Sequence, residues 1–521
     1  MIAETSTISA VIELIAQRAA SDPRGVAVRA KRRGIWHELT WSALDREVAI
    51  VAEGLRSVGV SPGQTVAIMA ENRLEWLTAY LAIQRLGASL LAISSRETPE
   101  TVGARLAARD VRVIVCGDQE HVDAVIDSGY APAAAVVMDP AGLERYPQSW
   151  IVAFDRVRTA GAEVAAAPPH GREISTVEHV NAELVDVPAR VMESNSANVA
   201  EILGIGKGDR MLVVAPLDDA VTRSVDIAAA IHGGATIHFP ESPTSVPEDL
   251  VEVRPTILAG PRRAFELIHF DARVEQHRTG ALRGAMIRWA YRGGRSGAAS
   301  PRRLLVLEHI AARHGLSKLR HVVVTGEERL ARETRGFLDA LGIDVLHAWG
   351  TPRLGGLVLV ESDVVVPEGA ELRDDERARA DDWRAQFATS GELTGAALEA
   401  ELREHEAFRR AIVVDTPRGR MAVFELDFDA AALWATRRKV EFSTKTSLAI
   451  APAIHELVES AIEKSGGTDV VDGYVIAPRE LTAAEGFLTS SEVVIRERVA
   501  DVFTDSIRTV SGRAHRKGAR A

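Results

Sequence analysis

The sequence predicts an α/β fold, in which a large N-terminal domain of stacked, helix-covered and mostly parallel sheets precedes a small α+β C-terminal domain. Strand–helix–strand patterns recur as far as Gly350. Their strands are short apolar runs rich in Val, Ile and Leu, which is typical of strands buried on both faces of a parallel sheet. Beyond residue 386, alternating strands and amphipathic helices indicate a separate, smaller domain.

The predicted elements follow one another in a regular order. An amphipathic helix is expected within residues 1–23, MIAETSTISAVIELIAQRAASDP. The first strand–helix–strand unit runs from Thr65 to Ile93, with Gly87 ending its helix. Repeated units of this kind predict parallel strands with helices on the sheet faces. Further units are predicted at residues 210–240, 254–270 and 319–350.

Three stretches lack these patterns. Residues 130–170 are rich in Ala and Pro, residues 274–303 are rich in Arg and Gly, and both are predicted to be connections or insertions. Residues 367–386 are charge-dense and poor in large apolar side chains, which favours a linker. The predicted division is an N-terminal domain at 1–385, a small C-terminal domain at 386–510 and a basic tail at 511–521.

Composition excludes several classes of protein. The chain has 521 residues, a net charge of −11 and a single cysteine, Cys116, which cannot form an internal disulfide and favours a reducing, cytoplasmic location. The acidic balance gives no electrostatic basis for binding nucleic acid. No long apolar run predicts a transmembrane segment. The absence of HExxH, CxxC and GxSxG patterns argues against a metal site and a serine-hydrolase nucleophile.

Five segments in order carry a resemblance that covers nearly the whole chain. They are WSALDREVAIVAEGLRSVGVSPGQTVAIMAENRLEWLTAYLAIQRLGASLLAI, GIGKGDRMLVVAPL, EDLVEVRPTILAGPRRAFELI, KLRHVVVTGEERL and FLDALGIDVLHAWGT. Together they resemble the adenylate-forming (AMP-binding) acyl-CoA synthetase superfamily, and within it the bacterial long-chain fatty acyl-CoA ligases. The resemblance implies an acyl-CoA synthetase-like fold. It also implies a reaction in which ATP, with Mg²⁺, and a carboxylate form an acyl-adenylate before coenzyme A accepts the acyl group.

The phosphate-binding motif of that superfamily is missing. Members carry a loop of the type TSGTTGxPKGV, and its position is occupied here by NAELVDVPARV, residues 181–191. The loop glycines are absent, although they let backbone N–H groups approach phosphate. The phosphate-binding lysine falls on Ala189, while Glu183 and Asp186 place acids where phosphate is expected. Repulsion is therefore predicted in place of anion binding.

The motif that offers an aromatic ring to adenine and an acid to Mg²⁺ is also altered. The family's YGxTE reads Trp349, Gly350, Thr351, Pro352 and Arg353 here. The aromatic residue is retained, whereas the acid has become the cation Arg353. We therefore interpret Trp349, Gly350 and Thr351, together with Gly326 in VVVTGEERL, as vestigial positions of a nucleotide site.

Two further motif positions have also lost the residue type that the family carries there. The aromatic or histidine of the family's PLxH is Asp219, and the catalytic lysine of its LTPTxKxRR ending falls on Val493. Only some 37 residues separate Arg353 from Ser390, where the family has more, so the ribose-binding segment is predicted to be deleted. None of the seven lysines matches a required position: Lys31, Lys207, Lys318, Lys439, Lys445, Lys464 and Lys517.

Simpler interpretations stand beside these. The glycines of GIGKGDR precede a strand and indicate a turn, because a nucleotide loop follows a strand. Gly326 fits both an adenine contact and an ordinary turn after a strand. Packing is favoured over ligand stacking for Trp349. Cys116 ends an apolar run and is expected to be buried.

The sequence therefore predicts a degenerate ligase, a probable pseudoenzyme that has lost ATP-dependent adenylation and acts by binding. No catalytic residue, metal or cofactor is predicted. The expected partners are a fatty acid or acyl-CoA, or a protein. The alternative is an active long-chain fatty acid CoA ligase with relocated catalytic residues, which would need ATP and Mg²⁺. Peripheral contact with anionic lipid is considered for the Arg-rich residues 283–303, with a solvated connection favoured.

Overall fold

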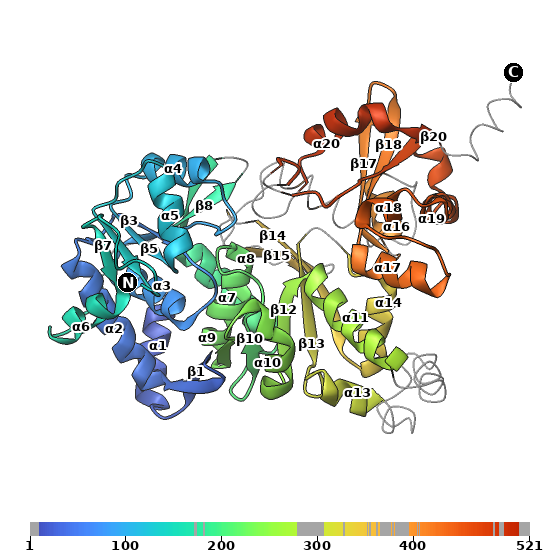
Figure 1. The fold of residues 1–521 in the computed structure, drawn as a ribbon. Helices are drawn as coiled ribbons and strands as arrows, with labels where there is room; N and C mark the ends of the chain where they lie inside the picture. The colour runs from blue at the N-terminus through green and yellow to red at the C-terminus, as the bar shows by residue number, and fades with distance from the viewer. Residues whose placement is uncertain are drawn as a thin grey trace, which may run out of the picture. The chain divides into compact units, whose positions relative to one another are not determined.

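A computed structural model gives the fold of the chain (Figure 1). Its described residues are 10–170, 175–180, 183–278, 307–326, 329–351, 353, 356–360, 363–364, 377, 380, 395–403, 405, 407–482, 485–488 and 494–509. The chain forms two compact units. Unit 1 contains residues 1–261, 308–325 and 346–372, and unit 2 contains residues 262–307, 326–345 and 373–521.

A seven-stranded sheet in unit 1 is parallel except at one edge. The predicted unit at Thr65 to Ile93 is confirmed, since its two strands pair in parallel on either side of a helix. Gly87 follows this helix at φ +67°, a conformation that glycine adopts without steric cost. The strand order is β7 (Ile151–Ala153), β6 (Ala134–Val137), β5 (Val113–Cys116), β3 (Thr65–Met69), β4 (Ser89–Ala92), β8 (Ser175–Val180) and β9 (Glu183–Pro188).

Three of the helices that accompany this sheet begin at side-chain caps. Thr40, Thr98 and Asp118 each accept a backbone N–H bond at the start of a helix. The amphipathic helix predicted near the N-terminus is present. The helices are α1 (Ala10–Ser21), α2 (Trp41–Ser57), α3 (Leu74–Arg85), α4 (Pro99–Ala108), α5 (Gln119–Asp127) and α6 (Phe154–Ala162).

The prediction that residues 130–170 form an irregular connection was wrong. This stretch contributes β6 and β7, which extend the sheet in parallel register, and α6, which packs on α2. The residues of the predicted insertion at 274–303 beyond Arg278, and most of those at 367–386, lie outside the described residues.

A nine-stranded sheet completes unit 1, apart from the first residues of β14. The pairs β10–β11, β10–β12 and β12–β13 are parallel, as the repeated units predict. The strand order is β16 (Asp363–Val364), β15 (Gly356–Val360), β14 (Asp344–Thr351), β13 (His321–Thr325), β12 (Ile257–Pro261), β10 (Arg210–Leu212), β11 (Thr236–Phe239), β1 (Val26–Arg32) and β2 (Ile35–Thr40). Its helices are α7 (Ala189–Ile202), α8 (Ala220–Thr222), the π-helix η1 (Arg223–Ala229), α9 (Ala230–Gly233), α10 (Val246–Val253) and α13 (Glu308–Arg313).

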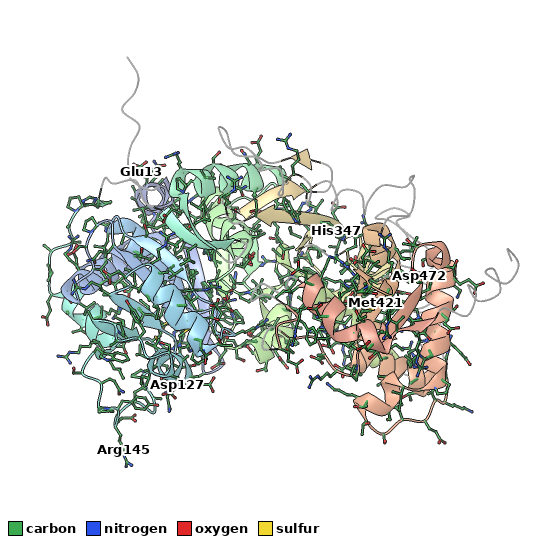
Figure 2. The ribbon with its side chains drawn as sticks, turned by 90° about the horizontal axis from the view of Figure 1, so that it is seen from above. Glu13, Asp127, Arg145, His347, Met421 and Asp472 are labelled. Carbon is green, nitrogen blue, oxygen red and sulfur yellow. The ribbon has the colours of Figure 1, made fainter. Side chains whose placement is uncertain are left out.

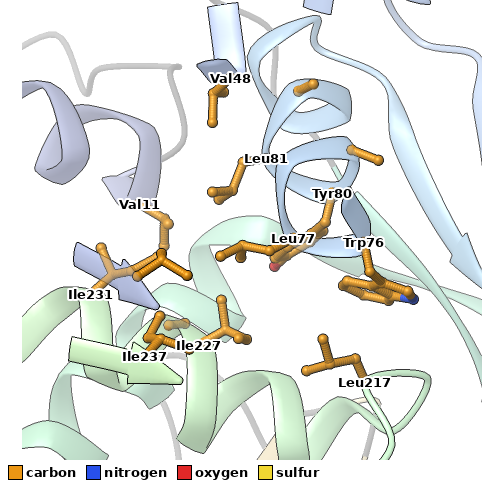
Figure 3. Packing of buried hydrophobic residues seen from close by; sticks show 14 of the residues in the cluster. Val11, Val48, Trp76, Leu77, Tyr80, Leu81, Leu217, Ile227, Ile231 and Ile237 are labelled. Carbon is orange, nitrogen blue, oxygen red and sulfur yellow. The ribbon is translucent and has the colours of Figure 1, made fainter. Parts of the chain in front are cut away.

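The main core of unit 1 joins side chains of both sheets with helices from each. Val11 of α1, Leu77 and Tyr80 of α3, and Ile227 of η1 meet here, as Figure 3 shows. Removal of this apolar surface from water is the principal stabilising contribution. A second cluster packs α4 and α5 against the strands of the seven-stranded sheet.

Unit 2 contains a four-stranded mixed sheet with an apolar cluster on each face. The buried Met421 of β18 is labelled in Figure 2. This region confirms the predicted small α+β fold. The elements are α11 (Arg262–Arg278), α14 (Arg332–Leu341), α16 (Gly395–Leu402), β17 (Phe408–Thr416), β18 (Gly419–Leu426), α17 (Phe428–Arg437), α18 (Lys445–Ala449), α19 (Pro452–Lys464), β19 (Gly473–Ile476), α20 (Arg496–Phe503) and β20 (Arg508–Thr509). In the described part of the chain, no helix has both the length and the hydropathy needed to cross a membrane.

Candidate functional site

The segment expected at the phosphate loop is mostly regular structure. Strands β8 and β9 pair antiparallel, and Val180 pairs with Glu183, so only two residues connect the strands. Residues 183–188 form β9, and Ala189 is the first residue of helix α7. A glycine-rich loop needs consecutive backbone N–H groups free to face a ligand. Residues 183–188 are paired with β8, so they do not form a loop of consecutive N–H groups that face a ligand.

Asp186 on β9 has its charge compensated locally. Its two carboxylate oxygens accept hydrogen bonds from Nη1 of Arg109 at 3.0 and 2.8 Å. Arg109 also donates to the carbonyl oxygen of Leu184 at 2.8 Å, which ties the end of α4 to β9. The acid that was expected to repel phosphate is therefore one half of an ion pair.

Asp219 has a structural role at the start of α8. Its carboxylate accepts from the backbone N–H and the hydroxyl of Thr222, at 2.9 and 3.0 Å. Arg223, fully buried on the following π-helix, donates to the carbonyl oxygens of Leu217 and Asp218 at 2.8 Å each. These bonds fix the loop between β10 and α8.

A group of buried polar side chains lies along η1 and the adjacent α7. Ser224 donates to Asn195 at 2.8 Å, and Ser196 lies 3.4 Å from Ser224. Asp226 is 1% exposed, and neither of its carboxylate oxygens has a hydrogen-bond partner. Burial, with the nearby charge of Asp219 as a second cause, raises the pKa of Asp226 well above its ordinary value. Sequence reasoning missed this group, because the segment reads as an ordinary helix.

A second polar cluster joins the two sheets of unit 1. Glu97 and Arg105 form an ion pair of 2.9 Å between side chains that are 3% and 9% exposed. Burial raises the pKa of Glu97 to about 7; Arg105 opposes the shift and Asp218 adds to it. The pKa of Asp218 is also raised by burial, against a hydrogen bond from Ser94. Asn72 strengthens the same junction, bonding to Ala215 and Leu217 at 2.7 and 2.9 Å.

Two of the β14 positions that the sequence analysis interpreted as vestigial are buried, and Gly350 between them is half-buried. Trp349 is 2% exposed and pairs with Leu359 of β15, with a register shift between Trp349 and Gly350. Thr351 is also buried, whereas Arg353 is half-buried just beyond the strand. These burials are what the packing interpretation of Trp349 requires.

The remaining motif positions to be located are Gly326 and Val493. Gly326 is exposed after β13 at φ +104°, the geometry of a turn. Val493 lies outside the described residues. Cys116 is fully buried, and burial raises the pKa of its thiol.

Unit 2 contains a small cleft between α11, α14 and α17. Its walls carry charges of both signs, and Arg263 pairs with Asp427 across it. None of its lining residues is a position of the nucleotide-site motifs, although Arg263, Glu266 and Leu267 lie in a segment that carries the resemblance. The lining residues are Arg263, Glu266, Leu267, Phe270, Arg273, Ala331, Thr334, Asp427, Asp429 and Ala430.

Comparisons with known proteins identify the class to which this fold belongs. Residues 15–175 match the family model described as AMP-binding enzyme. The structure superposes on the adenylation domain of carboxylic acid reductase from Segniliparus rugosus, solved with AMP and a co-purified carboxylic acid, with a TM-score of 0.70 and 14% identity. That match covers 95% of this chain and 93% of the other. The anthranilate CoA ligase AuaEII gives a TM-score of 0.65 at 14% identity, over 94% and 96%. The chain has the fold of an adenylate-forming enzyme.

Sequence similarity then gives particular relatives. Long-chain-fatty-acid–CoA ligase FadD15 of Mycobacterium tuberculosis is 24% identical to this chain over 96% of each protein. FadD15 of Mycobacterium bovis matches to the same extent. The chain thus contains an AMP-binding domain and is homologous to these ligases along nearly its whole length. The alignment has 591 positions against 521 residues, so at least 70 positions face gaps in this chain.

Proposed function

We propose that this chain has the adenylate-forming fold without ATP-dependent adenylation, and that it acts in the cytoplasm by binding a fatty acyl ligand or a protein partner. The observation that carries the proposal is the β8–β9 hairpin. Two residues connect its strands where an active relative needs a phosphate loop. The substitutions at Ala189 and Arg353 support the same conclusion, because neither side chain can replace the lysine or the acid of the family motifs.

The proposal includes two kinds of ligand, a fatty acyl compound and a protein partner, and homology bears on the first. Homology to long-chain ligases supports retention of an acyl-binding region. Loss of catalytic groups leaves binding as the remaining use of such a region. The domain boundary at 385/386 stays a prediction within this proposal.

The second candidate is an active ligase whose catalytic residues have moved. The observation in its favour is homology over 96% of both chains. Such an enzyme needs ATP, Mg²⁺ and groups that stabilise the charge developing on the transferred phosphate. We propose no cofactor for the leading candidate.

Thermal unfolding with three ligands tests the proposal. The purified chain is melted with Mg²⁺·ATP, with a long-chain fatty acid and with the matching acyl-CoA, because a ligand that binds the native state raises the melting temperature. We expect no shift with Mg²⁺·ATP and a shift with the fatty acid or acyl-CoA. If none of the three ligands shifts the transition, the protein-partner form of the proposal is favoured.

Pyrophosphate release provides the contrary outcome. Release on adding ATP and a fatty acid would establish the active-ligase candidate, whereas stabilisation by Mg²⁺·ATP alone would contradict the loss of the nucleotide site. Thr351→Val then distinguishes a retained nucleotide site from a new one, since Thr351 is next to Pro352, the residue that occupies the family's threonine position. Thr176→Val is the matched control, because Thr176 is equally buried on β8 and its hydroxyl has no hydrogen-bond partner.

A further inference from the structure

The connection from the end of α17 to the start of α19 carries a local positive charge on an acidic protein. Residues 437–450, here called the basic loop, contain four cations and one acid, Glu441, whereas the whole chain has a net charge of −11. All five charged side chains are exposed. The cations are Arg437, Arg438, Lys439 and Lys445.

The same loop exposes two large apolar side chains. Phe442 is 36% exposed and Ile450 is 64% exposed. Ile450 has the highest exposure of any large hydrophobic residue in the described part of the chain. Single exposed apolar residues are common on protein surfaces, but here two of them accompany a cluster of cations.

The basic loop is held in a defined shape. Thr444 and Ser447 form reciprocal capping bonds at the start of α18. Leu448 and Ala449 anchor this short helix in the core at 1% and 2% exposure, so the next residue, Ile450, is held outward. At the other end, Lys439 turns the chain at φ +57°.

Two cations of the basic loop lie over aromatic rings. The guanidinium of Arg438 lies 4.5 Å from the centre of the Trp434 ring, and the ammonium of Lys445 lies 5.3 Å from that of Phe428. Glu480 is 3.5 Å from Lys445, a long contact between exposed groups that water screens. These contacts position positive charge without removing it from the surface.

We propose that the basic loop docks on the surface of an anionic phospholipid membrane, with its cations at the level of the lipid phosphates and with Phe442 and Ile450 in the boundary between headgroups and acyl chains. Anionic lipid attracts each nearby Lys or Arg, and the boundary region removes apolar side chains from water. Nucleic acid would pair the cations but would leave Ile450 in water. The combination of charge and apolar tips therefore favours a membrane surface.

Vesicle sedimentation tests the proposal on the full chain. Binding is measured to phosphatidylglycerol vesicles and to phosphatidylcholine vesicles, at low and high salt. We expect binding to the anionic vesicles that weakens with salt. The double variant R438E/K439E should bind about tenfold or more weakly, since each cation contributes about 1 kcal/mol near such a surface. The double variant F442S/I450S should also weaken binding but should leave the salt dependence intact.

Two control variants make the same kinds of substitution outside the basic loop. R145E/K318E alters two exposed cations of unit 1, and Arg145 points away from the body of that unit in Figure 2. I35S/V164S removes two exposed apolar side chains, of 63% and 56% exposure. Equal loss in variant and control, equal binding to both vesicle types, or no binding to anionic vesicles would overturn the proposal. Retention of an acidic protein by the basic loop without vesicle binding would also overturn it, in favour of a protein partner. None of these outcomes depends on whether the chain binds ATP or an acyl ligand.

Discussion

The carboxylate of Glu97 lies 2.9 Å from Nε of Arg105, and the two side chains are 3% and 9% exposed. The contact is close, yet Oε2 of Glu97 has no aligned hydrogen-bond donor. Burial of a charge costs more than a poorly aligned partner returns. The carboxyl group therefore binds a proton more tightly in the folded chain than in water, with a pKa of about 7.

We expect Glu97→Gln to stabilise the chain at alkaline pH. The ordinary pKa of 4.5 applies in the unfolded chain, so the folded state holds more protons between pH 4.5 and about 7. The contribution of Glu97 to the free energy of unfolding falls across this window and is level above it. The variant resembles the protonated acid, so its advantage should grow from near zero at pH 4.5 to about 3 kcal/mol at pH 8.

Urea denaturation at pH 5 and pH 8 measures this difference. Glu100→Gln on the same α4 is the control, because hydrogen bonds lower the pKa of that exposed carboxyl and its effect has the opposite sign. An advantage of Glu97→Gln that is the same at both pH values would contradict the assignment.

Asp226→Asn is expected to raise the free energy of unfolding, by about 1–2 kcal/mol at pH 8. The buried carboxylate of Asp226 has no hydrogen-bond partner, and the amide removes the cost of ionising it. Because the pKa of Asp226 is raised, the gain should shrink as the pH is lowered. Asp219→Asn is the matched control: asparagine also caps helices, so little change is expected. A loss of stability in Asp226→Asn at pH 8 would show that the carboxylate has a stabilising partner.

Trp349→Ala should destabilise the chain by about 3–5 kcal/mol, the usual cost of emptying a buried aromatic site. The indole is 2% exposed on β14, so its removal leaves a cavity in the core. Trp349→Phe should cost clearly less. Guanidinium denaturation compares the two variants, and a cost below about 1 kcal/mol for Trp349→Ala would mean that the ring is kept for a ligand.

The repeated strand–helix–strand units could be predicted from the sequence because their apolar runs and glycine stops are local. Thr65 to Ile93 contains every signal that its unit needs. The two polar clusters could not be predicted in this way. Glu97 and Asp218 are more than 100 residues apart in the sequence, and the packing of the two sheets brings them together. The hydrogen-bond shift that makes η1 a π-helix leaves no mark in the pattern of RSVDIAA.

Motif reasoning assigned the expected phosphate loop to residues 181–191, and this assignment stays a prediction. The absence of glycine from residues 181–191 follows from the sequence alone. That residues 183–188 are a strand, and that Asp186 pairs with Arg109, depends on contacts across the fold. Residues 130–170 were misinterpreted because β6 and α6 are short, and because α6 ends in the small residues Ala160, Gly161 and Ala162.

Those small residues allow α6 to approach α2 closely, and this gives the last prediction. A Cβ on Gly161 would collide with the carbonyl oxygen of Ile50, and one on Gly54 with that of Val157. Alanine favours a helix over glycine by about 1 kcal/mol, but a backbone collision forces the helices apart. We expect Gly161→Ala and Gly54→Ala each to lower the free energy of unfolding by about 1–3 kcal/mol. Gly206→Ala, where nothing lies within 4 Å of the added carbon, should stay within about 0.5 kcal/mol of the native protein. Urea denaturation of the three variants measures these values, and an unchanged midpoint for Gly161→Ala would mean that α6 does not pack on α2 in solution.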